Sequence, residues 1–166
     1  MTGSEGRFTL TTGERVLATA ERVGELWMIT NLLGQEFSLV TLMDRNGTEV
    51  VLFDGALNAV VSLRQRGGKA SSVTVMDARN TPAAIVREDG LGGLHVVDLS
   101  GNAMLFAGRN RMCANSLDLL ITDAGAMRPI VSLFAIAVAL EGEQLGPLHS
   151  SQANFGESNP GDSKRP

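Results

Sequence analysis

The most apolar stretch of the chain covers residues 130–140, with the sequence IVSLFAIAVAL, and contains no charged side chain. A membrane-spanning helix needs about 20 apolar residues, whereas shorter runs are more typical of buried core helices. A helix here would be apolar on every side, which indicates a helix enclosed by other elements. Ile136, Val138 and Leu140 also alternate with alanines, so a buried strand is the alternative.

Upstream of this stretch, short apolar runs alternate with turn clusters, which is a hairpin signal. Each copy has an aspartate after the first run and a glycine or asparagine two or three residues later, as tight turns require. The clearest copies are FSLVTLMDRNGTEVVLF (37–53), SVTVMDARNTPAAIV (72–86) and LHVVDLSGNAMLF (94–106), with a weaker copy around Asp123.

The repeated aspartates, at positions 44, 77, 98 and 123, are unevenly spaced, unlike the fixed period of a solenoid or propeller. The copies therefore predict successive hairpins of one sheet, closed or nearly closed so that few strand edges are exposed. Residues 22–34 fit neither strand nor helix clearly. We expect a mainly β fold, a closed antiparallel β-barrel of about 10–12 strands around a hydrophobic C-terminal helix.

The chain is long enough for one domain with a substantial core. We expect a disordered arm at residues 1–6, a β-barrel domain at 7–146 with its core helix near 127–141, and a disordered tail at 147–166. The tail is polar and contains glycine and proline, a composition that cannot bury enough apolar surface to fold.

The formal net charge of −4 argues against a nucleic-acid partner, because such domains usually carry a basic excess. Cys113 is the single cysteine, which suits a reducing compartment. The N-terminal sequence MTGSEGRFTL lacks the layout of a signal peptide. We therefore expect a cytoplasmic protein, peripheral to a membrane if it meets one, with no transmembrane segment.

The order of these elements, hairpins in succession followed by an apolar C-terminal helix, resembles the tubby C-terminal-like superfamily, with its phospholipid scramblase and LURP-one-related branches. The resemblance covers roughly residues 7–141. It implies a twelve-stranded barrel around a central helix and a lipid-related, non-enzymatic role. The proline-rich segment and cysteine cluster of scramblases are missing, and only Asp118 and Asp123 precede the helix. Calcium takes six to eight oxygens, so calcium-triggered scrambling is not implied.

No residue pattern predicts catalysis, a metal site or a cofactor. His95 lies in a strand-like phrase and His149 in the polar tail, without the partners of a catalytic triad or the spacing of zinc ligands. Cys113 has basic neighbours that could lower the pKa of its thiol, but a structural loop cysteine is the simpler interpretation. The glycines at 90–93 precede a strand and do not open a helix, so we read them as a turn.

Two basic clusters are the candidate binding residues, Arg64, Arg66 and Lys69 in one inter-strand loop and Arg109 and Arg111 in another. In the tubby branch, basic side chains on the barrel contact phosphoinositide head groups. Guanidinium groups suit phosphate because they donate hydrogen bonds in a fork. If both loops lie on one rim, their cations could meet an anionic lipid surface, each contributing about 1 kcal/mol. The alternative is a pair of solvated polar loops.

The leading hypothesis is a lipid- or membrane-surface-binding barrel that is not an enzyme. The first alternative is a protein-interaction or regulatory scaffold module. The second is a small enzyme on an unrelated β-barrel, which would need an open, ligand-sized cavity where the helix is expected.

Overall fold

The computed structural model describes residues 2–4, 6–45, 47–66, 73–88, 94–109, 117–122 and 130–141. These residues form strands joined mostly by short turns, followed by one helix. The elements are β1 (Thr2–Ser4), β2 (Arg7–Thr12), β3 (Arg15–Val23), β4 (Leu26–Asn31), β5 (Glu36–Asp44), β6 (Gly47–Asp54), β7 (Ala59–Arg66), β8 (Val73–Asp77), β9 (Pro82–Glu88), β10 (Leu94–Asp98), β11 (Ala103–Arg109), β12 (Leu117–Ile121) and α1 (Ile130–Glu141).

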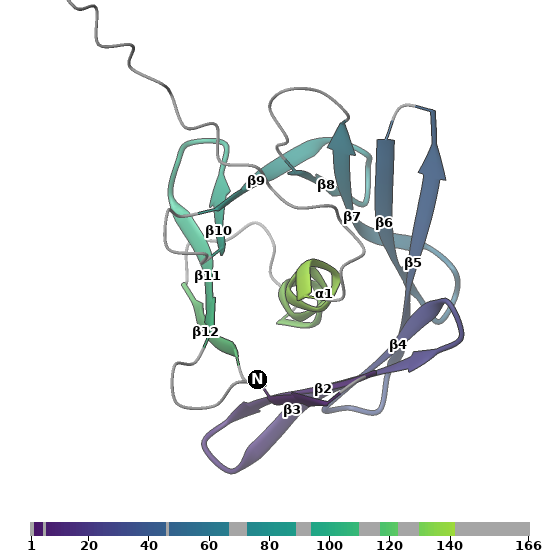
Figure 1. Cartoon of the computed structure of the whole chain (residues 1–166), viewed down its shortest axis with the longest axis vertical. Coiled ribbons are helices and arrows are strands. Elements are labelled where there is room, and N and C mark those ends of the chain that lie inside the picture. The colour runs from purple at the N-terminus through teal and green to yellow at the C-terminus, as the bar shows by residue number, and fades with distance from the viewer. Residues whose placement is uncertain are drawn as a thin grey trace, which may run out of the picture.

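The strands form one 12-stranded antiparallel sheet in which each strand pairs with its neighbours in sequence. The sheet curls around α1 (Figure 1). The predicted mainly β class, strand number and C-terminal helix are confirmed. Among the described strands no backbone ladder joins β1 to β12, so hydrogen bonds do not close the sheet.

The two ends of the chain bear differently on the predicted boundaries. Within the segment predicted as a disordered arm, Thr2–Ser4 form β1 and pair with β2, which corrects that prediction for these residues. The predicted tail, residues 147–166, lies outside the described residues. The untyped segment 22–34 contains β4, whose Trp27 and Ile29 are buried.

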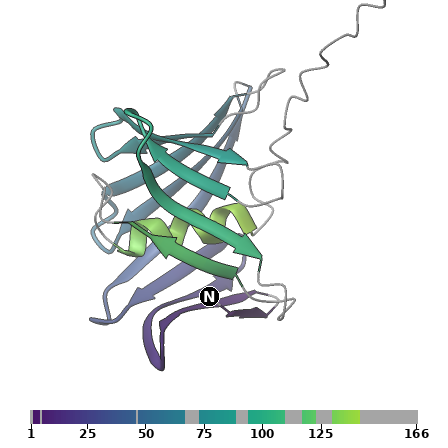
Figure 2. The ribbon, with the colours of Figure 1, turned by 90° about the vertical axis from the view of Figure 1, so that its left-hand side faces the viewer.

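Helix α1 lies inside the curled sheet, with strands on either side of it in Figure 2. Every side chain from Val131 to Ala139 is at most 4% exposed. A helix buried on all sides is what its uniformly apolar sequence predicts. The helical prediction is confirmed, and the buried-strand alternative is wrong.

The helix packs against β3, β4, β6 and β7. Small side chains allow this close approach: the buried residues of β3 are Ala18 and Ala20, and α1 contributes Ala135, Ala137 and Ala139. Larger side chains such as Leu39, Leu52 and Leu63 fill the remaining interior. The core is therefore a helix packed into an aliphatic sheet face, with its position set by alanines on both partners.

Antiparallel order places alternate connections at the same end of the sheet. The turns after β2, β4, β6, β8 and β10 share one end, which we call the Asx end for the turns described below. The turns after β3 and β5, and the final residues of β7, β9 and β11, share the other, which we call the loop end. This division decides which candidate residues can act together.

Candidate functional site

Four turns at the Asx end share one hydrogen-bond pattern, begun by Asn31, Asp54, Asp77 and Asp98. In each, the side-chain Oδ1 accepts the backbone N–H groups two and four residues later, over 2.7–3.0 Å. The backbone carbonyl of the first residue also accepts the N–H three residues later. These Asx turns therefore hold their tips in a defined conformation without help from the core.

The fourth residue of each turn is left-handed: Gly34, Leu57, Asn80 and Gly101 have φ values of 75°, 62°, 59° and 89°. Glycine and asparagine adopt this conformation readily, whereas leucine does so at a cost. The Leu57 side chain is 77% exposed, so burial does not offset the strain. Leu57 is therefore an exposed leucine held at a strained turn position.

Two carboxylates in these turns are held in their charged form. Hydrogen bonds from Asn58, first from its backbone N–H and then from its side chain, lower the pKa of Asp54. The side-chain amide and then the backbone N–H of Asn102 lower the pKa of Asp98. The carboxylates of Asp54 and Asp98 therefore stay ionised to a lower pH than those of ordinary aspartates.

Among the predicted lipid ligands, Arg64 is already paired within the sheet. Its Nη2 donates to Oε1 of Glu49 at 2.9 Å and to Oδ1 of Asn80 at 3.1 Å. Oε1 of Glu49 also accepts a hydrogen bond from Ser62 Oγ at 2.8 Å. The guanidinium of Arg64 thus ties the β8–β9 turn to the outer face of β6 and β7, and a phosphate would have to compete with that pair.

The other predicted ligands divide between the two basic loops. Arg66 is the last residue of β7 and Arg109 the last residue of β11, so both lie at the loop end. Lys69 and Arg111 lie outside the described residues. The strand order thus brings the beginnings of the two predicted basic loops to one end of the sheet.

Sequence reasoning missed other residues that share the loop end. Isolated arginines near separate turns made no cluster in the sequence, although their positions next to hairpin turns were a usable signal. Exposed arginines there are Arg22, Arg45 and Arg87, and exposed apolar side chains are Val23, Leu42 and Met43, at 56%, 49% and 78% exposure. Glu21, Glu25 and Asp44 lie among them, so the charge of this end is mixed.

The remaining sequence candidates are a histidine and a cysteine. The ring of His95 meets Phe106 edge to face, with centroids 4.5 Å apart, on neighbouring strands β10 and β11. Cys113 and His149 lie outside the described residues. His95 is thus an aromatic packing partner within the sheet.

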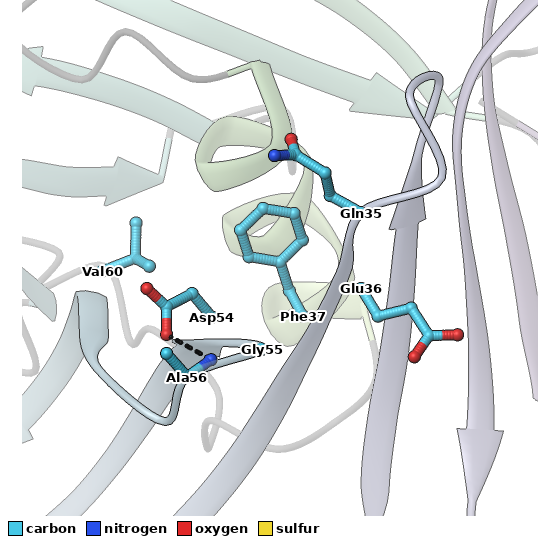
Figure 3. Close-up of a pocket in the computed structure, with 7 residues that line it drawn as sticks. All are labelled: Gln35, Glu36, Phe37, Asp54, Gly55, Ala56 and Val60. Atoms are coloured by element: carbon cyan, nitrogen blue, oxygen red, sulfur yellow. Dashed lines mark hydrogen bonds between the residues drawn. The ribbon is translucent and has the colours of Figure 1, made fainter.

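A pocket of about 480 Å³ opens at the Asx end between the β4–β5 and β6–β7 turns. Its lining comprises Gln35, Glu36, Phe37, Asp54, Gly55, Ala56 and Val60. In Figure 3 the ring of Phe37 lies in front of α1, while the side chain of Glu36 points away from Phe37. No sequence pattern predicted this pocket. Its walls come from two turns that are separated in sequence and are brought together only by strand pairing in the sheet.

Within the described residues, no helix is long and apolar enough to cross a bilayer. Comparison of the chain with protein families, with curated proteins and with solved structures finds no match.

Proposed function

We propose that this chain is a non-enzymatic, cytoplasmic module that binds anionic phospholipid at a membrane surface through its loop end. The observation that supports this is the convergence of the two predicted basic loops at one end. Arg66 and Arg109 end strands there, and Met43 and Leu42 are exposed at the same end of the sheet. Peripheral binding combines cations that attract anionic lipid with apolar side chains that enter the interface.

The filled interior of the sheet leaves the outer surface as the place where a lipid could bind. Helix α1 fills the space inside the sheet with buried apolar side chains. A ligand therefore meets the rims of the sheet, where the exposed apolar and charged residues lie. This is also the arrangement that the resemblance to the tubby C-terminal-like superfamily implies.

The resemblance further implies a barrel closed between β1 and β12. Phe8 of β2 and Leu119 and Ile121 of β12 pack against the same core. We assign closure to this side-chain packing across the seam, since no ladder of hydrogen bonds spans it in the described strands.

The mixed charge of the loop end limits the expected affinity for anionic lipid. Glu21, Glu25 and Asp44 offset part of the basic charge, and Arg64 is paired with Glu49. Binding should therefore be modest and sensitive to salt, because exposed charges are screened beyond about 10 Å at 0.1 M ionic strength. The apolar contacts of Met43 and Leu42 should persist at higher salt.

Sedimentation with lipid vesicles tests the proposal. The full chain should pellet with vesicles containing phosphatidylserine or a phosphoinositide at low salt, and much less with pure phosphatidylcholine. The double variant Arg66→Gln, Arg109→Gln should bind about thirtyfold more weakly, at about 1 kcal/mol per removed cation. The matched control is Arg15→Gln, Arg79→Gln, which removes two cations from the Asx end and should leave binding unchanged.

Two results would overturn the proposal. One is the absence of sedimentation at low salt with every anionic vesicle. The other is an equal loss of vesicle binding in the double variant and its control. That result would show that binding depends on the net charge of the chain and not on the arginines of the loop end. Met43→Ser, compared with Leu99→Ser at the Asx end, checks the apolar contribution in the same assay.

A further inference from the structure

The pocket at the Asx end has an apolar floor and an anionic mouth. Phe37 and Val60 line its inner part, and both pack against the hydrophobic core. The carboxylate of Asp54 lies at the β6–β7 turn and keeps its charge because Asn58 donates hydrogen bonds to it. A volume of about 480 Å³ lies within the range of pockets that hold ligands.

Exposed leucines flank this pocket on both sides. Leu33 belongs to the β4–β5 turn and Leu57 to the β6–β7 turn, and they are 79% and 77% exposed. Both turns are fixed by Asx hydrogen bonds, so the leucines are presented on an ordered surface. Large apolar side chains on rigid tips are preformed anchors, because little conformational entropy is lost when a partner covers them.

The charge around the pocket selects the partner. Asp54, Asp77 and Asp98 begin three of the four Asx turns, and Arg79 is the one basic residue within those turns. A basic side chain has an aliphatic stem that can lie on Phe37 and a cationic head that can pair with Asp54. An anionic membrane would be repelled by the same carboxylates.

We propose that this end is a second binding site, for a basic amphipathic segment of a partner protein. One arginine or lysine of the segment enters the pocket between Phe37 and Asp54. Apolar residues beside it on the segment contact Leu33 and Leu57. This site is separate from the loop end and does not depend on lipid binding there.

The turn at Asn31 suggests a substitution that removes the charge of Asp54 without disrupting its turn. Asn31 forms the same Asx turn with an amide, so Asp54→Asn keeps the turn hydrogen bonds and removes the negative charge. Asp98→Asn is the matched control, because it makes the same change in a turn that does not line the pocket. Gly55→Leu narrows the pocket: a Cβ at Gly55 would lie 3.7 Å from the Glu36 carbonyl oxygen, an ordinary contact.

Calorimetric and NMR titrations of the full chain test the site. The probe is a synthetic twelve-residue peptide of alternating leucine and arginine, compared with peptides in which glutamate replaces arginine or serine replaces leucine. Only the first should bind saturably, with shifts at Phe37, Gly55 and Ala56. Asp54→Asn and Gly55→Leu should each weaken binding by about tenfold at low salt, and Asp98→Asn by less than twofold.

Three other results would overturn the proposed peptide-binding site. Equal weakening by Asp54→Asn and Asp98→Asn would mean unspecific attraction to an acidic end. Equally tight binding of N-acetyl-arginine amide would mean a small-molecule site without leucine anchors. Loss of vesicle binding in Leu57→Asn would assign this end to lipid, whereas the loop-end double variant, which tests lipid binding separately, should bind the peptide normally.

Discussion

Arg64 and Glu49 are directly opposite each other on β7 and β6, and their side chains form an ion pair of 2.9 Å between Nη2 and Oε1. Both side chains are about 30% exposed, so water screens much of the attraction. Arg64→Gln should lower the free energy of unfolding by at most about 1 kcal/mol, as measured by urea denaturation. A double-mutant cycle with Glu49→Gln isolates the pair, and a coupling near zero would remove it as a stabilising contact.

The same pair predicts that Arg64 contributes little to lipid binding. Arg64→Gln should leave vesicle sedimentation nearly unchanged, whereas Arg66→Gln, Arg109→Gln should reduce it. A strong loss of vesicle binding in Arg64→Gln would show that lipid displaces Glu49 and would restore Arg64 as a lipid ligand.

Leu57 should be replaceable with a gain in stability. Its φ of 62° is costly for leucine, and its exposed side chain gives up little burial when removed. Leu57→Asn should raise the free energy of unfolding by about 0.5–1 kcal/mol, since Asn80 adopts the same conformation in the β8–β9 turn. Leu99→Asn in the β10–β11 turn is the control and should not stabilise; a stabilisation as large as that of Leu57→Asn would reject the strain argument.

The Asx turns should make stability depend on acid. The pKa values of Asp54 and Asp98 are lowered in the folded chain, so the folded state binds fewer protons than the unfolded state. Their contribution is present above the unfolded carboxyl pKa, near 4, and is lost as the pH falls through the lower folded value. Asp98→Asn should flatten the decline in unfolding free energy as the pH falls below about 4; an unchanged slope would contradict the assignment.

Two buried serines should respond in opposite directions to removal of the hydroxyl. Ser132 of α1 is 2% exposed, and its Oγ has no hydrogen-bond partner in the described part of the chain. Ser132→Ala should therefore stabilise the fold by about 1 kcal/mol. Ser62→Ala should destabilise it by a similar amount, because the Ser62 hydroxyl donates to Glu49. Thermal unfolding of both variants checks the pair, and destabilisation by Ser132→Ala would indicate that its hydroxyl is satisfied.

Ala137 tests the role of the helix as the core. Its side chain is 1% exposed, so Ala137→Glu buries a charge with no partner and should abolish folding. Ile130→Glu, at a helix position that is 38% exposed, is the matched control and should remain folded. Circular dichroism and size-exclusion chromatography compare the two, and a folded, monodisperse Ala137→Glu variant would falsify the enclosed-helix arrangement.

The helix and the hairpins could be predicted because short stretches of the sequence carry the signals for both. Residues 130–140 are apolar on all sides and too few to cross a bilayer, which leaves an enclosed helix. The hairpins follow from short apolar runs and turn residues. The closed barrel was also expected from these hairpins, but local patterns do not determine how the two ends of a sheet meet, and no backbone hydrogen bonds join β1 to β12 among the described strands.

The repeat was found in the sequence with only some of its members, Asp77 and Asp98. The Asx turns begin at positions 31, 54, 77 and 98, which are almost evenly spaced, whereas the sequence pattern picked Asp44 and passed over Asn31 and Asp54. Asp44 caps a different turn at the loop end, where its Oδ1 accepts the N–H of Gly47. The turn at Asp54 was not recognised in the sequence because Leu57 stands where such a turn favours glycine or asparagine.

The candidate site was predicted only in part for a similar reason. Clustering along the sequence identified Arg64 and Arg66, but the register of β6 and β7 decides that Arg64 faces Glu49. Separate hairpins contribute Arg22, Arg45 and the walls of the pocket, and local patterns do not connect them. Residues that converge through a sheet become visible only once the pairing order is known.

The enclosed helix also governs when this protein can fold during synthesis. Every strand pairs with a neighbour in sequence, so hairpins can form as the chain emerges. Their apolar faces stay uncovered until the last described element, Ile130–Glu141, arrives to fill the interior. The nascent sheet therefore exposes its apolar face until the helix is made, and we expect a chain that ends before Ile130 to aggregate instead of folding as a smaller domain.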